Sequence, residues 1–364
     1  GLRLRRQRLQ GTADDRLIVT NNGKISAVDG SAGGIFHHNN KGDIEYANLT
    51  NTGTVIGTGQ ESTGGLFGIN SGNISHSTLT NSGTVEGGTN TGGLIGKNSG
   101  DVSFSSLINE YSAEVTGGNN TGGLIGYNTG TIKGGRGEGN DGMTMYTDKI
   151  YNNGTVSGAF NVGGLIGNNA KEHDKTGSLY AAYNTGTVFG TGNNVGSIVG
   201  TNAGTVSSVF NTIMTATGQN QFVSGTSNVG GLIGSNIGTL KDAYNTTAVE
   251  TTSNGETKGN AVGENSGTVE NVYATNTDGK LIGNNTSDKV SNVYSFSTGD
   301  MSAEVIDSEE DRKQSISYND FAFGSTWKNY DGWSLPMLSV FLTKATYTDI
   351  SDLTYNATNQ SATG

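Results

Sequence analysis

The decapeptide Gly-Leu-Ile-Gly-Tyr-Asn-Thr-Gly-Thr-Ile occupies residues 123–132, and close copies of it recur along the chain. The copies stand about 31 residues apart, a period typical of stacked-repeat architectures. Clear copies begin at Gly65, Gly93, Gly123, Gly164, Gly196 and Gly231, and weaker ones begin at Gly34, Asn260 and Lys280. This pattern predicts an elongated scaffold in which most side chains serve the architecture.

Each repeat holds three short apolar clusters, such as Leu94 with Ile95, Val102 with Phe104, and Val115. Apolar residues do not recur at i, i+3, i+4 and i+7, so the pattern gives no support for helices. Short β-branched runs bounded by Gly and Asn are typical of strands. We therefore predict an all-β fold, a right-handed parallel β-helix of about nine to ten coils, with successive coils about 4.8 Å apart.

The repeated Gly-Thr-Val segment carries an expectation for each of its residue types. Alternation along a strand places Val inward and Thr outward. The Gly before Thr is expected to adopt positive φ at a corner, as at Gly83, Gly154 and Gly186. The Asn two residues earlier is expected to tolerate the same conformation, to bond its own backbone and to form ladders between coils, as at Asn81, Asn152 and Asn184.

Aromatic residues recur immediately before that Asn. They are Tyr151, Tyr183, Phe210, Tyr244, Tyr273 and Tyr294. Equal placement in successive coils predicts that their rings stack along one edge of the rod. The alternative hypothesis is that they form a carbohydrate-binding platform.

Composition limits the function classes. The 364 residues include 60 Gly, one Pro and no Cys, so neither a collagen helix nor a disulfide framework is expected. The net charge of −11 argues against nucleic-acid binding by the body of the chain. No run of 18 apolar residues is present, so we expect no membrane insertion.

The organisation of the chain changes near Thr298, where the repeat stops. Both Trp residues and the single Pro follow, within a segment that we interpret as an aromatic C-terminal cap, because repeat arrays need atypical ends. The expected division is an N-terminal lead-in at 1–30, the repeat β-helix at 31–299, the cap at 300–343, and a linker or start of a further β-domain at 344–364.

The repeat units closely resemble the GLUG motif, and residues 327–342 resemble the Trp, Tyr-x-Gly, Pro-x-Leu and Phe-Leu segment that ends such arrays. Both occur in large bacterial surface adhesins of the filamentous-haemagglutinin type, secreted by the two-partner route. Thr354-Tyr355-Asn356 is similar to the opening of the tandem β-domains that follow in such proteins. The resemblance implies a non-enzymatic, secreted or cell-surface rod that mediates attachment. GLUG units also flank the catalytic part of immunoglobulin A-cleaving metallopeptidases, so the motif alone does not identify an adhesin.

Residue patterns that carry catalysis are scarce. The four His residues, His37, His38, His76 and His173, form no His-Glu-x-x-His motif. The Asp-rich calcium nonapeptide is absent as well. Carboxylates are scattered, as at Glu61, Glu86, Asp101 and Glu114, although two of them could still meet across coils. We therefore predict no catalytic residue, no metal site and no cofactor.

Variation concentrates in insertions, and the longest is 133–150. Because binding residues on repeat scaffolds are usually carried by such loops, it is the candidate ligand-contact loop. Its candidate residues are Lys133, Arg136, Glu138, Asp141, Met143 and Tyr146. Shorter insertions lie at 171–175, 215–227 and 250–259. The expected partner is a host-cell or bacterial surface receptor, with glycans among the candidates, alongside lateral or end-to-end self-association.

Two other functions stay open from the sequence. One is a β-helix carbohydrate-active enzyme or a tailspike-like glycan-binding protein. The other is ice binding through outward Thr residues, although Glu114 and Ala248 stand in the Thr position of two repeats.

Overall fold

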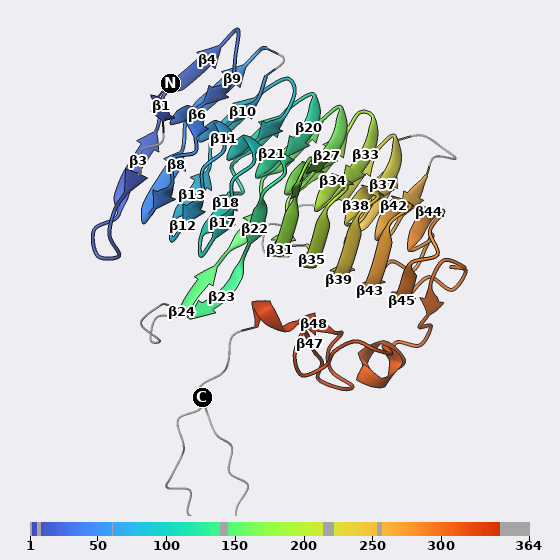
Figure 1. The fold of residues 1–364 in the computed structure, drawn as a ribbon. Coiled ribbons are helices and arrows are strands. Elements are labelled where there is room, and N and C mark those ends of the chain that lie inside the picture. Colours follow the sequence, from blue (N-terminus) through green and yellow to red (C-terminus); the bar gives the residue numbers. More distant parts are fainter. Residues whose placement is uncertain are drawn as a thin grey trace, which may run out of the picture.

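The computed structural model describes residues 2–5, 9–59, 61–138, 145–213, 222–252 and 257–342. Parallel strands stack coil upon coil into a β-solenoid of about eight turns (Figure 1). The described residues contain no α-helix, only short 3-10 turns, which include η2 (Asp311–Lys313), η3 (Ser315–Ser317) and η4 (Ser339–Phe341).

Four stacked sheets form the walls, and they are described in the order in which each repeat passes through them, D, A, B and C. Sheet D consists of β5 (Ala32–Gly33), β10 (Thr63–Gly64), β15 (Thr91–Gly92), β20 (Asn119–Gly122), β27 (Phe160–Gly163), β33 (Asn193–Gly196), β37 (Ser227–Gly230) and β41 (Lys258–Gly259). Sheet A consists of β1 (Leu2–Arg5), β6 (Phe36–Asn40), β11 (Phe67–Asn70), β16 (Ile95–Asn98), β21 (Ile125–Asn128), β28 (Ile166–Asn169), β34 (Val199–Asn202), β38 (Ile233–Asn236), β42 (Val262–Asn265) and β44 (Ile282–Asn285).

Sheet B changes its form along the rod. In the first coils it has two strands per turn, in the series β2 (Leu9–Gln10), β7 (Ile44–Glu45), β12 (Ile74–Ser75), β17 (Val102–Ser103), β22 (Thr131–Lys133) and in the series β3 (Leu17–Asn21), β8 (Ala47–Asn51), β13 (Thr78–Asn81), β18 (Ser106–Asn109), β25 (Ile150–Asn152). Later coils have one long strand, in β31 (Ser178–Asn184), β35 (Thr205–Asn211), β39 (Thr239–Asn245), β43 (Thr268–Ala274) and β45 (Val290–Ser295), and the short β46 (Glu304–Val305) follows.

Sheet C closes each turn. It consists of β4 (Lys24–Ala27), β9 (Thr54–Gly57), β14 (Thr84–Glu86), β19 (Glu114–Thr116), β26 (Thr155–Gly158), β32 (Val188–Gly190), β36 (Phe222–Gly225) and β40 (Ala248–Thr251). Three small antiparallel pairs lie outside the walls: β23 (Gly135–Glu138) with β24 (Met145–Asp148), β29 (Lys171–Glu172) with β30 (Lys175–Thr176), and β47 (Trp327–Lys328) with β48 (Met337–Leu338).

The core is the apolar column enclosed by these walls, as the alternation predicts. Val85 and Val156 are fully buried, whereas Thr155 before the second Val is exposed. Leu124 of the opening decapeptide is 1% exposed. One residue of each pair therefore supplies the core, and its neighbour faces solvent.

The predicted Asn ladders are confirmed, and there are two buried ones. At the end of sheet A the amide of Asn98 donates to Asn128 Oδ1 at 2.9 Å, and neighbouring coils repeat the bond. At the end of sheet B the amide of Asn152 donates to Asn184 Oδ1 at 2.8 Å. A third, half-buried ladder follows sheet D, where Asn161 donates to Asn120 Oδ1 at 2.9 Å.

The conformational explanation of the repeat glycines was wrong. Gly83, Gly154 and Gly186 do not have positive φ, and neither do the asparagines that precede them. A Cβ on Gly83 would lie 2.0 Å from the carbonyl oxygen of Gly53 in the coil below, so Gly is required by close stacking. Positive φ occurs at other positions, mostly at non-Gly corners such as Asn161 at 52°, and also at five glycines outside the Gly-Thr-Val segments.

The aromatic C-terminal segment does not cover the end of the solenoid, so the expected cap is not confirmed. It folds back along the flank of the solenoid, beside the carboxyl-terminal ends of β31, β35, β39 and β43 (Figure 1). The last turn is closed by other groups, since Ser302 Oγ accepts a hydrogen bond from the backbone N–H of Ile282 at 3.1 Å. We call residues 307–342 the strap. The expected domain at 344–364 lies outside the described residues.

Candidate ligand-binding sites on the insertions

The longest insertion forms an antiparallel hairpin, β23–β24, that projects from sheet B (Figure 1). Lys133 ends β22 and is exposed. Arg136 pairs with Thr147, and Glu138 pairs with Met145, so these candidate residues lie at known positions of the hairpin backbone. Tyr146 lies opposite Gly137. The remaining candidates, Asp141 and Met143, lie outside the described residues.

The insertion at 171–175 forms a second hairpin, β29–β30, that is fixed against earlier coils. Its Glu172 accepts a hydrogen bond from Tyr127 Oη at 2.7 Å and lies 3.7 Å from Lys97 Nζ. The Lys97 ammonium stands 4.9 Å from the centre of the Tyr127 ring. Burial and the Glu172 carboxylate both raise the pKa of Tyr127, so the phenol keeps its proton and donates.

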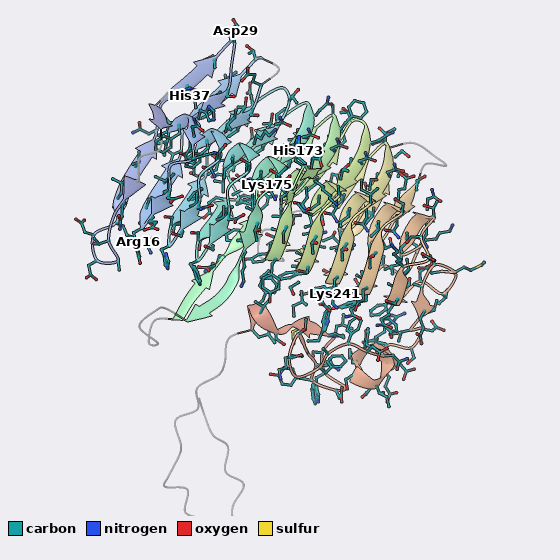
Figure 2. All side chains as sticks on the ribbon, in the orientation of Figure 1. Arg16, Asp29, His37, His173, Lys175 and Lys241 are labelled. Atoms are coloured by element: carbon teal, nitrogen blue, oxygen red, sulfur yellow. The ribbon has the colours of Figure 1, made fainter. Side chains whose placement is uncertain are left out.

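Lys175 secures the other side of this hairpin by donating to the carbonyl oxygen of Ser99. His173 at the tip has a φ of 51°. In Figure 2 the side chains of His173 and Lys175 lie over the middle coils, away from Arg16 and Asp29 on the first coils. The hairpin therefore lies over the corner of the solenoid that includes Ser99.

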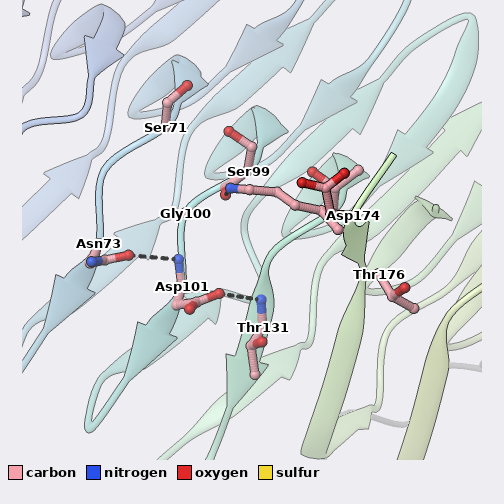
Figure 3. A pocket seen from close by; sticks show the side chains of 10 residues that line it. Ser71, Asn73, Ser99, Gly100, Asp101, Thr131, Asp174 and Thr176 are labelled. Atoms are coloured by element: carbon pink, nitrogen blue, oxygen red, sulfur yellow. Dashed lines mark hydrogen bonds between the residues drawn. The ribbon is translucent and has the colours of Figure 1, made fainter. Parts of the chain in front are cut away.

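A polar cleft of about 320 Å³ lies beside this hairpin (Figure 3). Asp101 is central to it, because Oδ1 accepts from the Thr131 backbone N–H at 2.8 Å while its own N–H donates to Asn73 Oδ1 at 3.1 Å. Gly100, Lys175, the Asp174 carboxylate and hydroxyl groups of stacked corner residues complete the lining; the hydroxyls come from Ser71, Ser99, Thr129, Thr131 and Thr176. Hydroxyls, an amide and carboxylates are groups that suit a polyhydroxylated ligand.

The predicted aromatic stack is present in five of its six positions. The rings of Tyr151, Tyr183, Phe210, Tyr244 and Tyr273 stack in series with centroids 4.9–5.3 Å apart. Tyr294 leaves the series: its ring meets those of Tyr318 and Phe321 at 67° and 77°. Phe296 stacks on Tyr273 in its place, with centroids 6.1 Å apart.

The strap covers much of this stack, which weakens the platform hypothesis. Trp327 is fully buried against Tyr244 and Tyr273, and its indole N–H donates to Asp242 Oδ1 at 3.1 Å. Tyr273 Oη donates to the carbonyl oxygen of Pro336 at 2.7 Å. Because Phe341 of the strap also contacts Tyr183 and Phe210, four of the five stacked rings lie against the strap.

A second, shorter stack was not predicted. The rings of Tyr46, His76 and Phe104 lie 4.9 and 5.1 Å apart on one corner, and all three residues have positive φ. Their spacing of about one repeat was the available signal. In the described part of the chain no three His, Cys, Asp or Glu residues are grouped to hold a metal ion. His37 and His38 are adjacent, with ring centroids 6.4 Å apart.

The chain matches no family model, no curated protein and no solved structure. None of the helical turns in the described residues has the length and apolar character needed to cross a bilayer.

Proposed function

We propose that this chain is a non-enzymatic, rod-shaped segment of a secreted or cell-surface bacterial adhesin, and that its insertions contact the receptor. The observation that carries the proposal is that the wall strands build the solenoid, whereas the hairpins lie outside it. Inward-facing wall side chains are committed to the core and to Asn ladders, and one outward row forms the ring stack. The β23–β24 hairpin projects away from the walls in Figure 1.

The proposal includes the number of coils and the role of the aromatic C-terminal segment. Sheet A has ten strands where sheets C and D have eight, which supports partial coils beyond the eight complete turns and a total of about nine to ten. In this proposal the aromatic segment protects the flank of the solenoid, where we had expected it to cap the end. The proposal includes no nucleic-acid binding, because the net charge is −11. It includes no membrane insertion, because the sequence has no run of 18 apolar residues.

A replacement experiment tests the proposal. Residues 136–147 are replaced by a Gly-Asn turn, and attachment of protein-coated beads to host cells and to bacteria is counted. The melting temperature is expected to stay nearly unchanged, since corners tolerate changes in loop length. Attachment is expected to fall at least tenfold. Glu86→Lys, an exposed change on sheet C, is the control and should attach normally.

A second arm replaces residues 172–175 in the same way. Loss of attachment only in this arm would move the contact site to the β29–β30 hairpin. Unchanged attachment in both arms, with folding intact, would contradict the proposal and favour a passive spacer.

Glycan binding is the second candidate, and the cleft beside β29–β30 favours it. Asp101 and Asp174 both line that cleft together with stacked hydroxyls. Binding to an oligosaccharide array that is lost in Asp174→Asn would support this function. Release of reducing sugar by the wild-type chain would instead support the carbohydrate-active enzyme. Ice binding has less support, because the register places Glu114 between Thr84 and Thr155 in the outward row.

A further inference from the structure

A separate pocket of about 390 Å³ lies where three distant segments meet. Asp148 and Lys149 come from the base of the β23–β24 hairpin, Tyr183 and Phe210 from the aromatic stack, and Val340 and Phe341 from the strap. A ligand that entered here would contact an insertion, a wall and the C-terminal segment at once. The volume is in the range typical of small-molecule sites.

The walls of the pocket are mainly apolar. Phe341 stands at 89° to the Tyr183 ring and at 84° to the Phe210 ring, with centroids 5.7 and 4.9 Å away. Because Tyr183 and Phe210 stack on their neighbours, their faces are occupied, and only their edges are available to Phe341. The strap therefore adds apolar surface to the pocket.

Asp148 is the one carboxylate among the residues that line this pocket. Asp148 is half-buried and pairs with Gly135 through its backbone, but in the described part of the chain its carboxylate makes neither a hydrogen bond nor an ion pair. Burial raises the pKa of Asp148 to about 6, so the group is largely ionised at neutral pH although it is poorly solvated. A desolvated charge without a partner is unfavourable, and a cation placed beside it would remove that cost.

We propose that this pocket binds an organic cation, a primary ammonium group carried on an apolar or aromatic body. The ammonium would bond the Asp148 carboxylate, and the body would pack against Val340 and Phe341. Lys149 also lines the pocket, but its side chain is exposed to solvent and makes no ion pair with Asp148. The proposal stands apart from the adhesive function, because the base is the only part of the β23–β24 hairpin that lines the pocket.

The probe that tests it is 2-phenylethylamine, titrated against the full chain at pH 7.5 with ligand-detected NMR. The wild-type chain is expected to bind it saturably, and Asp148→Asn is expected to weaken the affinity at least tenfold, because a charge-assisted bond is lost. The neutral analogue 2-phenylethanol should bind at least tenfold more weakly than the amine. Asp174→Asn, in the cleft beside β29–β30, should bind the amine as the wild type does.

The pH profile gives a second readout. Affinity of the wild-type chain for the amine should fall as the pH is lowered from 7.5 to 5, because Asp148 takes up a proton, while the affinity of Asp148→Asn should stay constant. The other titratable groups that line the pocket are Lys149 and Tyr183. Burial raises the pKa of Tyr183 above its ordinary value, so the phenol does not titrate between pH 5 and 7.5. Absence of saturable binding, or equal affinity in Asp148→Asn, would overturn the proposal. Either result leaves the attachment assay of the hairpin variant unaffected.

Discussion

The buried asparagines act as the polar counterpart of the apolar core. Asn184 is fully buried, and its amide donates to the carbonyl oxygen of Gly186 at 2.9 Å and to Asn211 Oδ1 at 3.0 Å. Its Oδ1 accepts from Asn152 and from the Gly186 N–H. One side chain thus satisfies a turn within its own coil and connects two others. That is why Asn, with donor and acceptor on one short side chain, recurs at this position.

The first prediction removes one rung of a ladder. Asn184→Ala should lower the free energy of unfolding by about 3 kcal/mol, because several buried polar groups lose their partners together. Asn161→Gly is the matched control: that ladder is half-buried, and Gly accepts the φ of 52°. It should cost about 1 kcal/mol. Urea unfolding of both variants measures the difference, and equal costs would mean that burial of the ladder is unimportant.

The second prediction concerns the inward and outward assignment. Leu124→Asp would place an unpaired charge in the apolar column and should cost more than about 4 kcal/mol. Thr205→Asp is the control, since Thr205 is exposed and its neighbours across the sheet are Ser178 and Thr239. Its melting temperature should stay within a few degrees of the wild type. If the two variants melt alike, the assignment of faces is incorrect.

At the residue scale the sequence was sufficient where periodicity alone decides. The burial of Val85 and the exposure of Thr155 follow from alternation, and so do the Asn ladders. It was insufficient for Gly83, because Gly is used both for positive φ and for close approach. Only the structure shows the carbonyl oxygen of Gly53 in the space that a Cβ would need.

At the scale of the strand and its turn, the first three coils stack so closely at the Gly of the Gly-Thr-Val segment that a methyl group cannot fit between them. The same motif position carries Gly23 in the first coil, Gly53 in the second and Gly83 in the third. A Cβ on Gly53 would meet the carbonyl oxygen of Gly23 at 2.0 Å. A Cβ on Gly23 itself would meet nothing nearer than Asn21 Oδ1 at 3.9 Å.

This contrast gives the third prediction. Gly83→Ala should lower the free energy of unfolding by about 3 kcal/mol or more, because the backbone must move to admit the methyl group. Gly23→Ala should be neutral within about 1 kcal/mol, since neither space nor φ opposes it. Thermal melting of the two variants separates them. A large loss of stability in Gly23→Ala would show that conformation, not stacking, selects glycine here.

The insertions predicted at 133–150 and 171–175 form hairpins outside the walls, but their geometry was not predicted. Those predicted at 215–227 and 250–259 overlap the wall strands β36, β37, β40 and β41, and their other residues lie partly outside the described ranges. The β29–β30 hairpin is bonded to an earlier coil, because Lys175 donates to the carbonyl oxygen of Ser99, 76 residues earlier in the chain. The Asp148 pocket needs Phe341 from the strap. Contacts at such sequence separation leave no local signal, whereas a break in the repeat is visible directly.

At the scale of the whole molecule, the strap joins coils that the repeat alone would leave connected only to their neighbours. Phe341 contacts Tyr183 and Phe210, while Trp327 contacts Tyr244 and Tyr273, so one segment spans four coils. Stability in repeat arrays is otherwise a sum of nearest-neighbour terms. We therefore expect the strap to make unfolding of these coils more cooperative.

The last prediction shortens the chain at two points. A chain that ends at Ile306 keeps β46 and the Ser302 closure of the last turn but loses the strap. It would expose the edges of Tyr244 and Tyr273 and remove the indole donor from Asp242. Its melting temperature should fall on the order of 10 °C, because several aromatic side chains lose their burial together.

A chain that ends at Leu342 is the matched control, since it keeps the strap and should melt as the full chain does. The chain that ends at Ile306 should also bind the dye 8-anilinonaphthalene-1-sulfonate, which reports exposed apolar surface, and should unfold over a broader range of urea concentration. Identical melting of the two shortened chains would mean that the stacked coils support themselves. The strap would then be an attachment on the flank that adds no cooperativity.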